Sequence, residues 1–237
     1  LHGFCYYHYW FNGRRVLERR FEEVLRSGDP DLPFCLCWAN DNWTRIWDGG
    51  SQHMLLEQRY SAADDHAHAE SLLPAFCDPR YVRVDGRPMF LIYRTALLPD
   101  PAATAKRWRD VVRAHGLADL YLVRVESHAD FSTPQSLGFD AAVEFAPFNG
   151  LGPRLFRTRL DGIRRRLALL PRATGENNYY RYADVARRMS QRPRTEFECI
   201  PCVTPGWDNT ARRRDGATVL LDATPAEYCA WLQRAVH

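Results

Sequence analysis

The stretch Pro33-Phe34-Cys35-Leu36-Cys37-Trp38-Ala39-Asn40-Asp41-Asn42-Trp43 carries the pattern from which the fold can be inferred. Its first half, residues 33–38, is an apolar run of strand length, which is typical of a strand buried on both faces of a parallel sheet. Its second half places two amides and a carboxylate between tryptophans, directly after that strand. In proteins built from parallel strands, functional residues follow the strand ends. The stretch therefore predicts a parallel sheet with a site at its carboxyl edge.

The same pattern recurs along the chain, because apolar runs bounded by turn residues alternate with amphipathic stretches. The expected strands are residues 3–7, 33–38, 88–93, 120–125, 141–145 and 198–203. The expected helices are residues 15–27, 62–76, 102–115, 180–191 and 225–236. Residues 149–178, rich in Gly, Pro and Arg, are expected to form a long connection with one short helix.

Six βα-like units without an internal repeat or a linker predict one domain over residues 1–237. We expect a (β/α)8 TIM-type barrel, of which about six of eight strands lie in this chain, with the first and last missing. A doubly wound open sheet is the alternative. Its nucleotide-binding versions need the glycine fingerprint GxGxxG after a strand, which the sequence lacks.

Composition limits the partners and the compartment. The formal net charge of +3 is too small to predict a nucleic-acid partner. The basic stretch at residues 154–166 is either a solvated helix face or an anion site. The seven cysteines lie largely in apolar runs, where Cys acts as a small hydrophobe, which favours a reducing, cytoplasmic location. No apolar run is long enough for a transmembrane segment.

Residues that follow the predicted strands have the chemistry of a sugar site. Aromatic rings stack on the C–H faces of a pyranose, while amides and charged groups bond its hydroxyls. Tryptophans could instead cap the core, His8 could be a buried histidine, and part of the Asn40–Asn42 triplet could be a structural turn. The predicted substrate-binding residues are His8, Tyr9, Trp10, Trp38, Asn40, Asn42, Trp43, Arg45, Trp47, Asp48, Tyr93, Arg94, Trp207, Asp208, Asn209 and Arg212.

Glycosidic chemistry usually needs two carboxyl groups on either side of the scissile bond. Asp41, Glu126 and Glu144 are the catalytic candidates at predicted strand ends, and each could also serve as a salt-bridge anchor. We expect no metal and no cofactor, because the sequence has no HExxH motif and no Gly-rich phosphate loop, and the lack of a GxSxG turn argues against a serine nucleophile.

Five stretches resemble the WbsX-like domain, which is also called glycoside hydrolase family 99-like, and the match spans nearly the whole chain. They are GFCYYHYWF (residues 3–11), CWANDNWTR (37–45), DGRP (85–88), GFDAAVEF (138–145) and PGWDNT (205–210). Members of that family are described as bacterial glycosyltransferases of surface-polysaccharide and O-antigen biosynthesis. The resemblance implies a (β/α)8 barrel, with a first strand before Leu1 and an eighth after His237.

The chain departs from the family pattern at two points. Asp41 stands where the family more often has Glu, which puts a proton-transfer role at this position in doubt. The catalytic glutamates of the family-99 hydrolases lie in an Asn-Glu-Trp-x-Glu-Gly type segment on the last strand, and no such segment occurs before His237. No residue of this chain inherits those two roles.

The sequence leaves three functions open. The resemblance favours glycosyl transfer, with an oligosaccharide or a sugar donor as partner, and a nucleotide-sugar donor would make Arg45, Arg94 and Arg212 its diphosphate contacts. A barrel with strand-end carboxylates is also typical of a glycoside hydrolase or transglycosylase, here of endo-acting mannosidase type. A non-catalytic carbohydrate-binding module is the third option.

Overall fold

A computed structural model describes residues 2–45, 50–128, 132–155, 177–213 and 216–236. Their contacts divide the chain into two compact units. The first unit comprises residues 1–42, 56–144 and 195–200, and the second comprises residues 43–55, 145–194 and 201–237. The expectation of a single domain stays a prediction.

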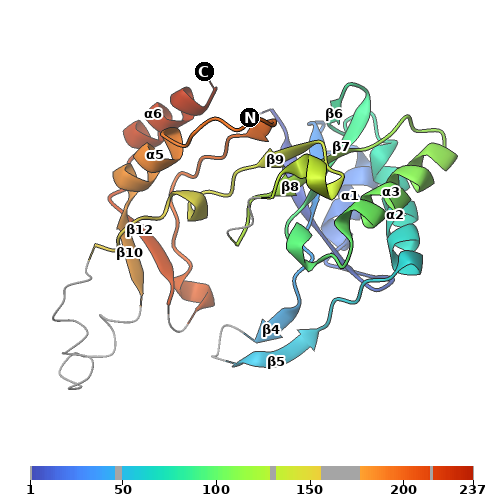
Figure 1. Cartoon of the computed structure of the whole chain (residues 1–237), viewed down its shortest axis with the longest axis horizontal. Coiled ribbons are helices and arrows are strands. Elements are labelled where there is room, and N and C mark those ends of the chain that lie inside the picture. Colours follow the sequence, from blue (N-terminus) through green and yellow to red (C-terminus); the bar gives the residue numbers. More distant parts are fainter. Residues whose placement is uncertain (1, 46–49, 129–131, 156–176, 214–215, 237) are drawn as a thin grey trace. The chain divides into compact units, whose positions relative to one another are not determined.

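The first unit is built on a sheet whose six main strands run parallel, each pairing with the next along the chain (Figure 1). These strands are β1 (Phe4–Phe11), β3 (Phe34–Trp38), β7 (Arg87–Ile92), β8 (Tyr121–Val125), β9 (Ala141–Val143) and β11 (Cys199–Ile200). Each lies on one of the six predicted runs. Sequential parallel pairing is typical of repeated βα connections, so the predicted parallel α/β fold class is confirmed.

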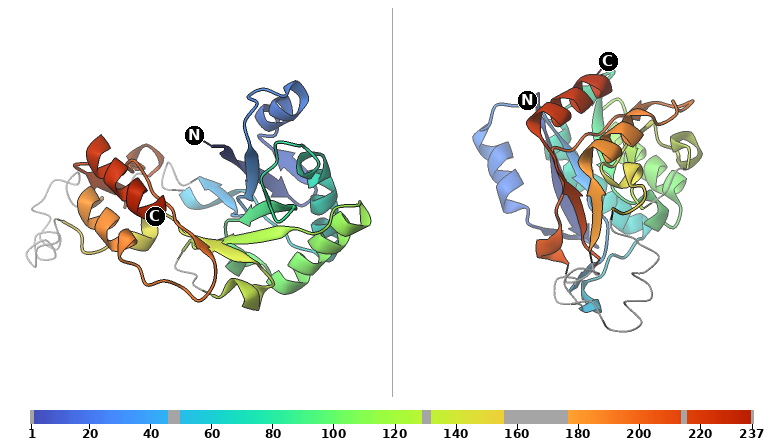
Figure 2. Two further views of the ribbon diagram at one scale, coloured as in Figure 1. Left: turned by 90° about the horizontal axis from the view of Figure 1, so that it is seen from above. Right: turned by 90° about the vertical axis from the view of Figure 1, so that its left-hand side faces the viewer.

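Three helices accompany this sheet (Figure 2): α1 (Arg19–Ser27), α2 (Ala62–Phe76) and α3 (Pro101–Ala114). The Ser61 side chain accepts a hydrogen bond from the Asp64 backbone N–H and so caps α2. Asp100 caps α3 in the same way, and Pro101 occupies the first helical position, where its missing N–H costs nothing. The predicted bounds of α2 are confirmed, and α3 begins one residue earlier than predicted.

The first unit contains two β-hairpins that were not predicted from the sequence. Strand β2 (Arg14–Val16) pairs antiparallel with β1 through the two-residue turn Asn12-Gly13, and both turn residues have positive φ. Strand β6 (Arg83–Val84) pairs with β7 through Asp85-Gly86, again with positive φ at both residues. Asn-Gly and Asp-Gly are the dipeptides that favour such turns. The helix predicted from residue 15 therefore begins only at Arg19.

The described residues of the second unit form two small sheets and two helices. Strands β4 (Trp43–Arg45) and β5 (Gly50–Leu56) form one sheet, and β10 (Asn178–Arg181) pairs parallel with β12 (Thr218–Leu221) in the other. The helix expected from residue 180 begins later, as α5 (Tyr182–Ser190), because the preceding residues pair with β12. Helix α6 (Pro225–Val236) has the predicted bounds, and its Trp231 packs edge-on against Tyr182 at 5.8 Å between ring centroids.

The described residues also form short 3₁₀ helices: Thr95–Leu97, Pro134–Leu137, Phe148–Gly150 and Thr210–Arg212. The short helix predicted within residues 149–178, and most of the basic stretch at 154–166, fall outside the described residues. None of the described helices is long and apolar enough to cross a membrane.

Candidate functional site

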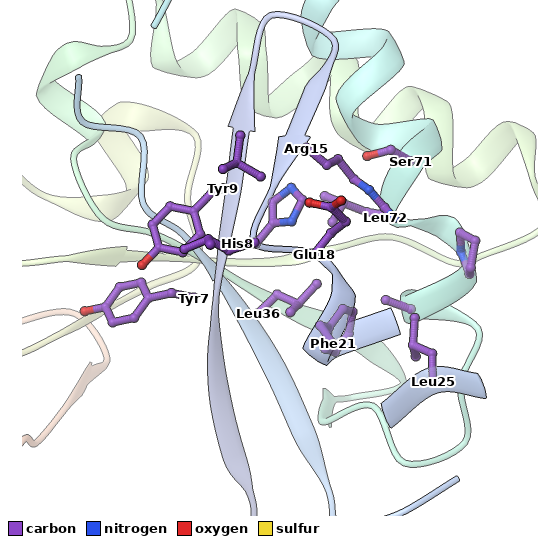
Figure 3. A pocket seen from close by; sticks show the side chains of 14 residues that line it. Tyr7, His8, Tyr9, Arg15, Glu18, Phe21, Leu25, Leu36, Ser71 and Leu72 are labelled. Carbon is purple, nitrogen blue, oxygen red and sulfur yellow. The ribbon is translucent and has the colours of Figure 1, made fainter. Parts of the chain in front are cut away.

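The sheet of the first unit has two chemically different faces. Trp38 and Phe90 point toward the helices, since their rings lie 5.7 Å and 5.5 Å from that of Trp108 in α3. Successive residues of a strand alternate between faces, so Tyr7 and Tyr93 point the other way. We call these the helix face and the opposite face. Figure 3 shows Tyr7 and Tyr9 on the other side of β1 from Phe21 and Leu25.

A group of aromatic rings gathers on the opposite face. The rings of Tyr7 and Tyr9 stack at 6.4 Å, Tyr7 meets Tyr93 edge-on at 6.3 Å, and Tyr93 meets His128 edge-on at 5.7 Å. We call these four residues the tyrosine patch. Tyr7 is 51% exposed, Tyr9 and Tyr93 are half-buried, and His128 is exposed. The patch presents apolar ring surface with hydroxyl groups attached, which is the combination that binds a pyranose.

Tyr9 and Tyr93 were predicted from the sequence, whereas Tyr7 was not. The Tyr-x-Tyr spacing of Tyr7 and Tyr9 was the available signal, because residues two apart in a strand share a face. A tyrosine phenol ordinarily has a pKa of about 10, so that of Tyr7 is protonated near neutral pH and can donate a hydrogen bond to a sugar oxygen.

Asn40 joins the ends of β3 and β7. Its amide accepts a hydrogen bond from the Arg94 backbone N–H and donates one to the Arg94 carbonyl, both at 2.9 Å. It also donates to the Tyr60 hydroxyl at 3.2 Å, and it is fully buried. Asn40 therefore holds the backbone next to Tyr93, and its amide does not present an open surface to substrate.

The other two residues of the predicted triplet, Asn42 and Asp41, have different surroundings. Asn42 accepts a hydrogen bond from the Gln58 backbone N–H at 2.7 Å, which ties the segment after β3 to the segment after β5. Asp41 instead pairs with Arg94, at 2.8 Å between Oδ1 and Nη1, and both side chains are about one third exposed (33% and 27%). Asp41 follows the end of β3 and Arg94 follows the end of β7, so the two residues form a partly accessible ion pair between these strand ends.

Trp10 and Trp38 are core residues in this structure. Trp10 is 5% exposed and donates to Asp64 Oδ1 at 3.0 Å, while Trp38 is 1% exposed and donates to the Trp10 carbonyl at 3.3 Å. Both indoles pack against the imidazole of His68, at 5.1 Å and 4.5 Å between centroids. Neither ring offers a free face. The sequence left open whether these tryptophans bind substrate or pack in the core, and the structure favours core packing for both.

His8 lies with His68 on the helix face, and their Nε2 atoms are 3.0 Å apart. A cavity of about 40 Å³ adjoins His8 between β1, α1 and α2 (Figure 3). One water molecule occupies about 30 Å³ of liquid, so this cavity is too small for a sugar ring. It lies on the helix face, and Tyr7 and Tyr9 border it while their rings point to the other side of β1.

The histidine pair predicts that the fold weakens in acid. Burial, and then the charge of Arg15, lowers the pKa of His8 to about 3, and burial, followed by His8, lowers that of His68 well below its usual value. A histidine whose pKa is lowered by folding contributes stability that is present above its unfolded pKa and is lost as the pH falls. Burial also raises the pKa of nearby Asp64, which opposes this effect in part.

We therefore expect the free energy of unfolding to fall by about 2 kcal/mol per histidine between pH 7 and pH 5. His68→Gln should reduce this dependence in urea titrations at the two pH values. His66 is the matched control, because it lies on the same helix with a side chain 58% exposed. An equal dependence on pH in His68→Gln, His66→Gln and the unsubstituted protein would contradict this account.

The remaining catalytic candidates lie at the ends of neighbouring strands. The Glu126 backbone N–H donates to the Val143 carbonyl at 2.9 Å, and that of Glu144 donates to Ile200 at 3.0 Å. Glu126 is 2% exposed, and its carboxylate lies 3.6 Å from the guanidinium of Arg124, which is fully buried. Glu144 is half-buried. Of the three candidates, Asp41 and Glu144 retain accessible surface and Glu126 is enclosed.

The second unit holds the other predicted residues. The Trp207 ring meets Phe148 edge-on at 5.3 Å, and Phe148 stacks on Phe145 at 5.4 Å. Asp208 accepts a hydrogen bond from the Thr210 backbone N–H, which lowers its pKa, and Asn209 accepts one from Thr218. Arg212 is exposed and Trp43 is half-buried. Trp47, Asp48 and the side chain of Arg45 lie outside the described residues.

The described residues contain no group of three His, Cys, Asp or Glu side chains arranged to hold a metal ion. The sequence has one Cys-x-x-Cys spacing, Cys199-Ile200-Pro201-Cys202, of which the sequence-based predictions took no account. In the structure these two cysteines belong to different units.

Comparison with known proteins extends these observations. The model of the family described as "Glycosyltransferase WbsX" matches residues 1–237. Protein WxcX, in two strains of Xanthomonas campestris pathovar campestris, is 39% identical over 237 residues. That alignment covers 100% of this chain and 33% of the relative, so the chain spans about a third of the length of the curated relatives it matches.

Solved structures with the same fold are more distant in sequence. A "Glycoside hydrolase-like protein" aligns with a TM-score of 0.51 and 16% identity over 91% of this chain and 60% of its own. The GH99 endo-alpha-mannosidase from Bacteroides thetaiotaomicron aligns with a TM-score of 0.50 and 12% identity, over 96% of this chain and 57% of its own. At these identities the likeness shows the fold. The family match over the whole length shows that this chain belongs to the WbsX glycosyltransferase family.

Proposed function

We propose that this chain contributes the sugar-binding part of a carbohydrate-active enzyme, and that the enzyme is a glycosyltransferase of bacterial surface-polysaccharide or O-antigen biosynthesis. The observation that carries the proposal is the tyrosine patch, and the ion pair of Asp41 and Arg94, which follow the ends of β3 and β7, adds charge near those strand ends. Family membership supports the reaction class. The six parallel strands, paired in chain order, support a (β/α)8 barrel in which these residues belong to the active-site end.

Each group of the site has a part in the proposed binding. The rings of Tyr7, Tyr9 and Tyr93 stack on the C–H faces of a sugar, and their hydroxyls bond its hydroxyl groups. The Arg94 guanidinium, steadied by Asp41, suits a phosphate oxygen of an activated donor, because charge-assisted bonds to phosphate are strong. Asn40 fixes the backbone from which Tyr93 and Arg94 extend.

A second function, glycoside hydrolysis or transglycosylation of endo-mannosidase type, is favoured by the likeness to the GH99 endo-alpha-mannosidase fold. This reaction needs two carboxyl groups on either side of the bond. Asp41 and Glu144 are the accessible candidates here, and the pair that the family resemblance implies belongs to a later segment. A binding module without catalysis is the third candidate.

The three functions predict different products. The protein should be incubated with nucleotide sugars and, separately, with mannan-type oligosaccharides. Transfer releases nucleoside diphosphate in the presence of an acceptor, whereas hydrolysis releases reducing ends. A binding module yields neither product but still binds the oligosaccharide. For transfer, Arg94→Ala should raise the KM for the nucleotide sugar, and Arg94→Lys should restore part of the loss. Absence of nucleotide release with every donor would contradict the first proposal.

A further inference from the structure

Three cysteines lie together on the opposite face, next to the tyrosine patch. Cys5 of β1 stands in register with Cys35 of β3, and Tyr7 stands in register with Cys37. Because the register partners of parallel strands point to the same face, the three thiols and Tyr7 share one side of the sheet. All three cysteines are free. Cys5 is exposed, whereas Cys35 is 5% and Cys37 is 4% exposed.

The geometry points to a redox-sensitive dithiol, in which peroxide oxidises Cys5 and Cys35 then closes a disulfide between β1 and β3. Because Cys5 is the exposed member of the group, it is the cysteine that peroxide oxidises first. The neighbouring thiols of Cys35 and then Cys37 stabilise its thiolate and lower the pKa of Cys5, whereas the contact with Cys5 raises the pKa of Cys35. The thiolate is the nucleophilic form, so Cys5 is the reactive member of the pair.

Strand geometry selects Cys35 as the partner. Adjacent strands lie about 4.8 Å apart, so the Cα atoms of the register pair Cys5 and Cys35 fall in the range of about 4.4–6.8 Å that a disulfide spans. Cys37 lies two residues further along β3, which places its Cα roughly 8 Å from that of Cys5, beyond the limit of about 7 Å. Cys37 can therefore stabilise the Cys5 thiolate but cannot bridge to it without backbone movement.

The chemistry balances with hydrogen peroxide as the oxidant. The Cys5 thiolate attacks one peroxide oxygen, an S–O bond forms, the O–O bond breaks, and hydroxide leaves, so that sulfur loses two electrons and becomes a sulfenic acid. The sulfur of Cys35 then attacks that of Cys5. An S–S bond forms, the S–O bond breaks, and the departing hydroxide takes the Cys35 proton as water. A small-molecule thiol reverses the reaction by disulfide exchange.

The test is peptide mass spectrometry after brief treatment of the full chain with hydrogen peroxide and alkylation of the remaining thiols. We expect a peptide pair joined through Cys5 and Cys35, assigned by fragmentation because Cys35 and Cys37 share a tryptic peptide. Cys35→Ala should leave a sulfenic acid on Cys5 that dimedone traps. Cys37→Ala should still form the disulfide, at a lower rate at pH 6.

The exposed cysteines Cys77 and Cys229 serve as internal controls. At pH 6 Cys5 should be alkylated on the order of tenfold faster than either of them, because more of it is thiolate. Reaction of Cys5 at the rate of Cys77, or a bond from Cys5 to Cys37 in place of Cys35, would overturn the inference. So would dimedone labelling of Cys5 in the unsubstituted protein without subsequent disulfide formation.

Discussion

Trp38→Ala is expected to lower the free energy of unfolding by about 3–5 kcal/mol, the range observed when a large buried aromatic side chain is truncated. The indole is 1% exposed and packs against Trp108, Tyr60 and His68, so its removal leaves a cavity that these rings cannot fill without shifting. A domain of this kind has about 5–15 kcal/mol of stability in total, so the loss is a large fraction of it. Urea denaturation followed by far-ultraviolet circular dichroism measures the change.

Tyr7→Ala is the matched control, because that ring is 51% exposed on the opposite face. It should cost less than about 1 kcal/mol, since surface substitutions have small effects. If Trp38→Ala folded as stably as Tyr7→Ala, the placement of Trp38 in the core would be wrong. Its role as a substrate contact, predicted from the sequence, would then regain support.

Glu126→Ala is expected to be comparably damaging, at about 3–5 kcal/mol, because breaking a buried ion pair by removing one of its two members is strongly destabilising. Arg124 is fully buried and Glu126 is 2% exposed, so water cannot readily replace the lost carboxylate. This cost is independent of any role in catalysis. Thermal unfolding of the purified variant provides the measurement.

Two further variants separate a structural from a catalytic role of Glu126. The double variant Arg124→Met with Glu126→Leu should recover most of the stability, because apolar residues of similar volume can replace a buried ion pair. Glu126→Gln keeps the shape of the side chain. If Glu126→Gln abolished activity while Glu126→Ala left stability unchanged, Glu126 would be a catalytic residue and its assignment as a structural ion-pair partner would fail.

The sequence predicted the parallel sheet well for a local physical reason. Each of the six strands is a short apolar run flanked by turn residues, and caps such as Ser61 and Asp100 mark where helices begin. The Asn12-Gly13 and Asp85-Gly86 dipeptides are also turn signals in the sequence. At the first of them, an amphipathic pattern after residue 15 suggested a longer helix instead of a hairpin. Residues 178–181 pair with β12, about 40 positions away, and such a contact leaves little local signal.

The candidate site was predicted less completely, because a strand-end residue can face either side of the sheet. Tyr9 and Trp10 are neighbours in the sequence, yet Tyr9 joins the tyrosine patch and Trp10 enters the core with Asp64. Asn40 and Asp41 are also neighbours, yet Asn40 is buried and bonds the Arg94 backbone, whereas Asp41 forms a partly accessible ion pair with the Arg94 side chain. Residue type indicates which side chains could bind a sugar, whereas strand register decides which of them lie on the face that carries the tyrosine patch.

The most direct test of the proposed sugar site is calorimetric titration of the oligosaccharide or nucleotide sugar that the full-length protein uses. Tyr93→Ala should weaken binding by on the order of tenfold through lost stacking, Tyr93→Phe should retain most of the affinity, and the half-buried Tyr179 of the second unit, changed to Ala, should have no effect. Circular dichroism should show that each variant is folded. Unchanged affinity in both Tyr93→Ala and Tyr7→Ala would contradict the assignment of the tyrosine patch as the sugar site.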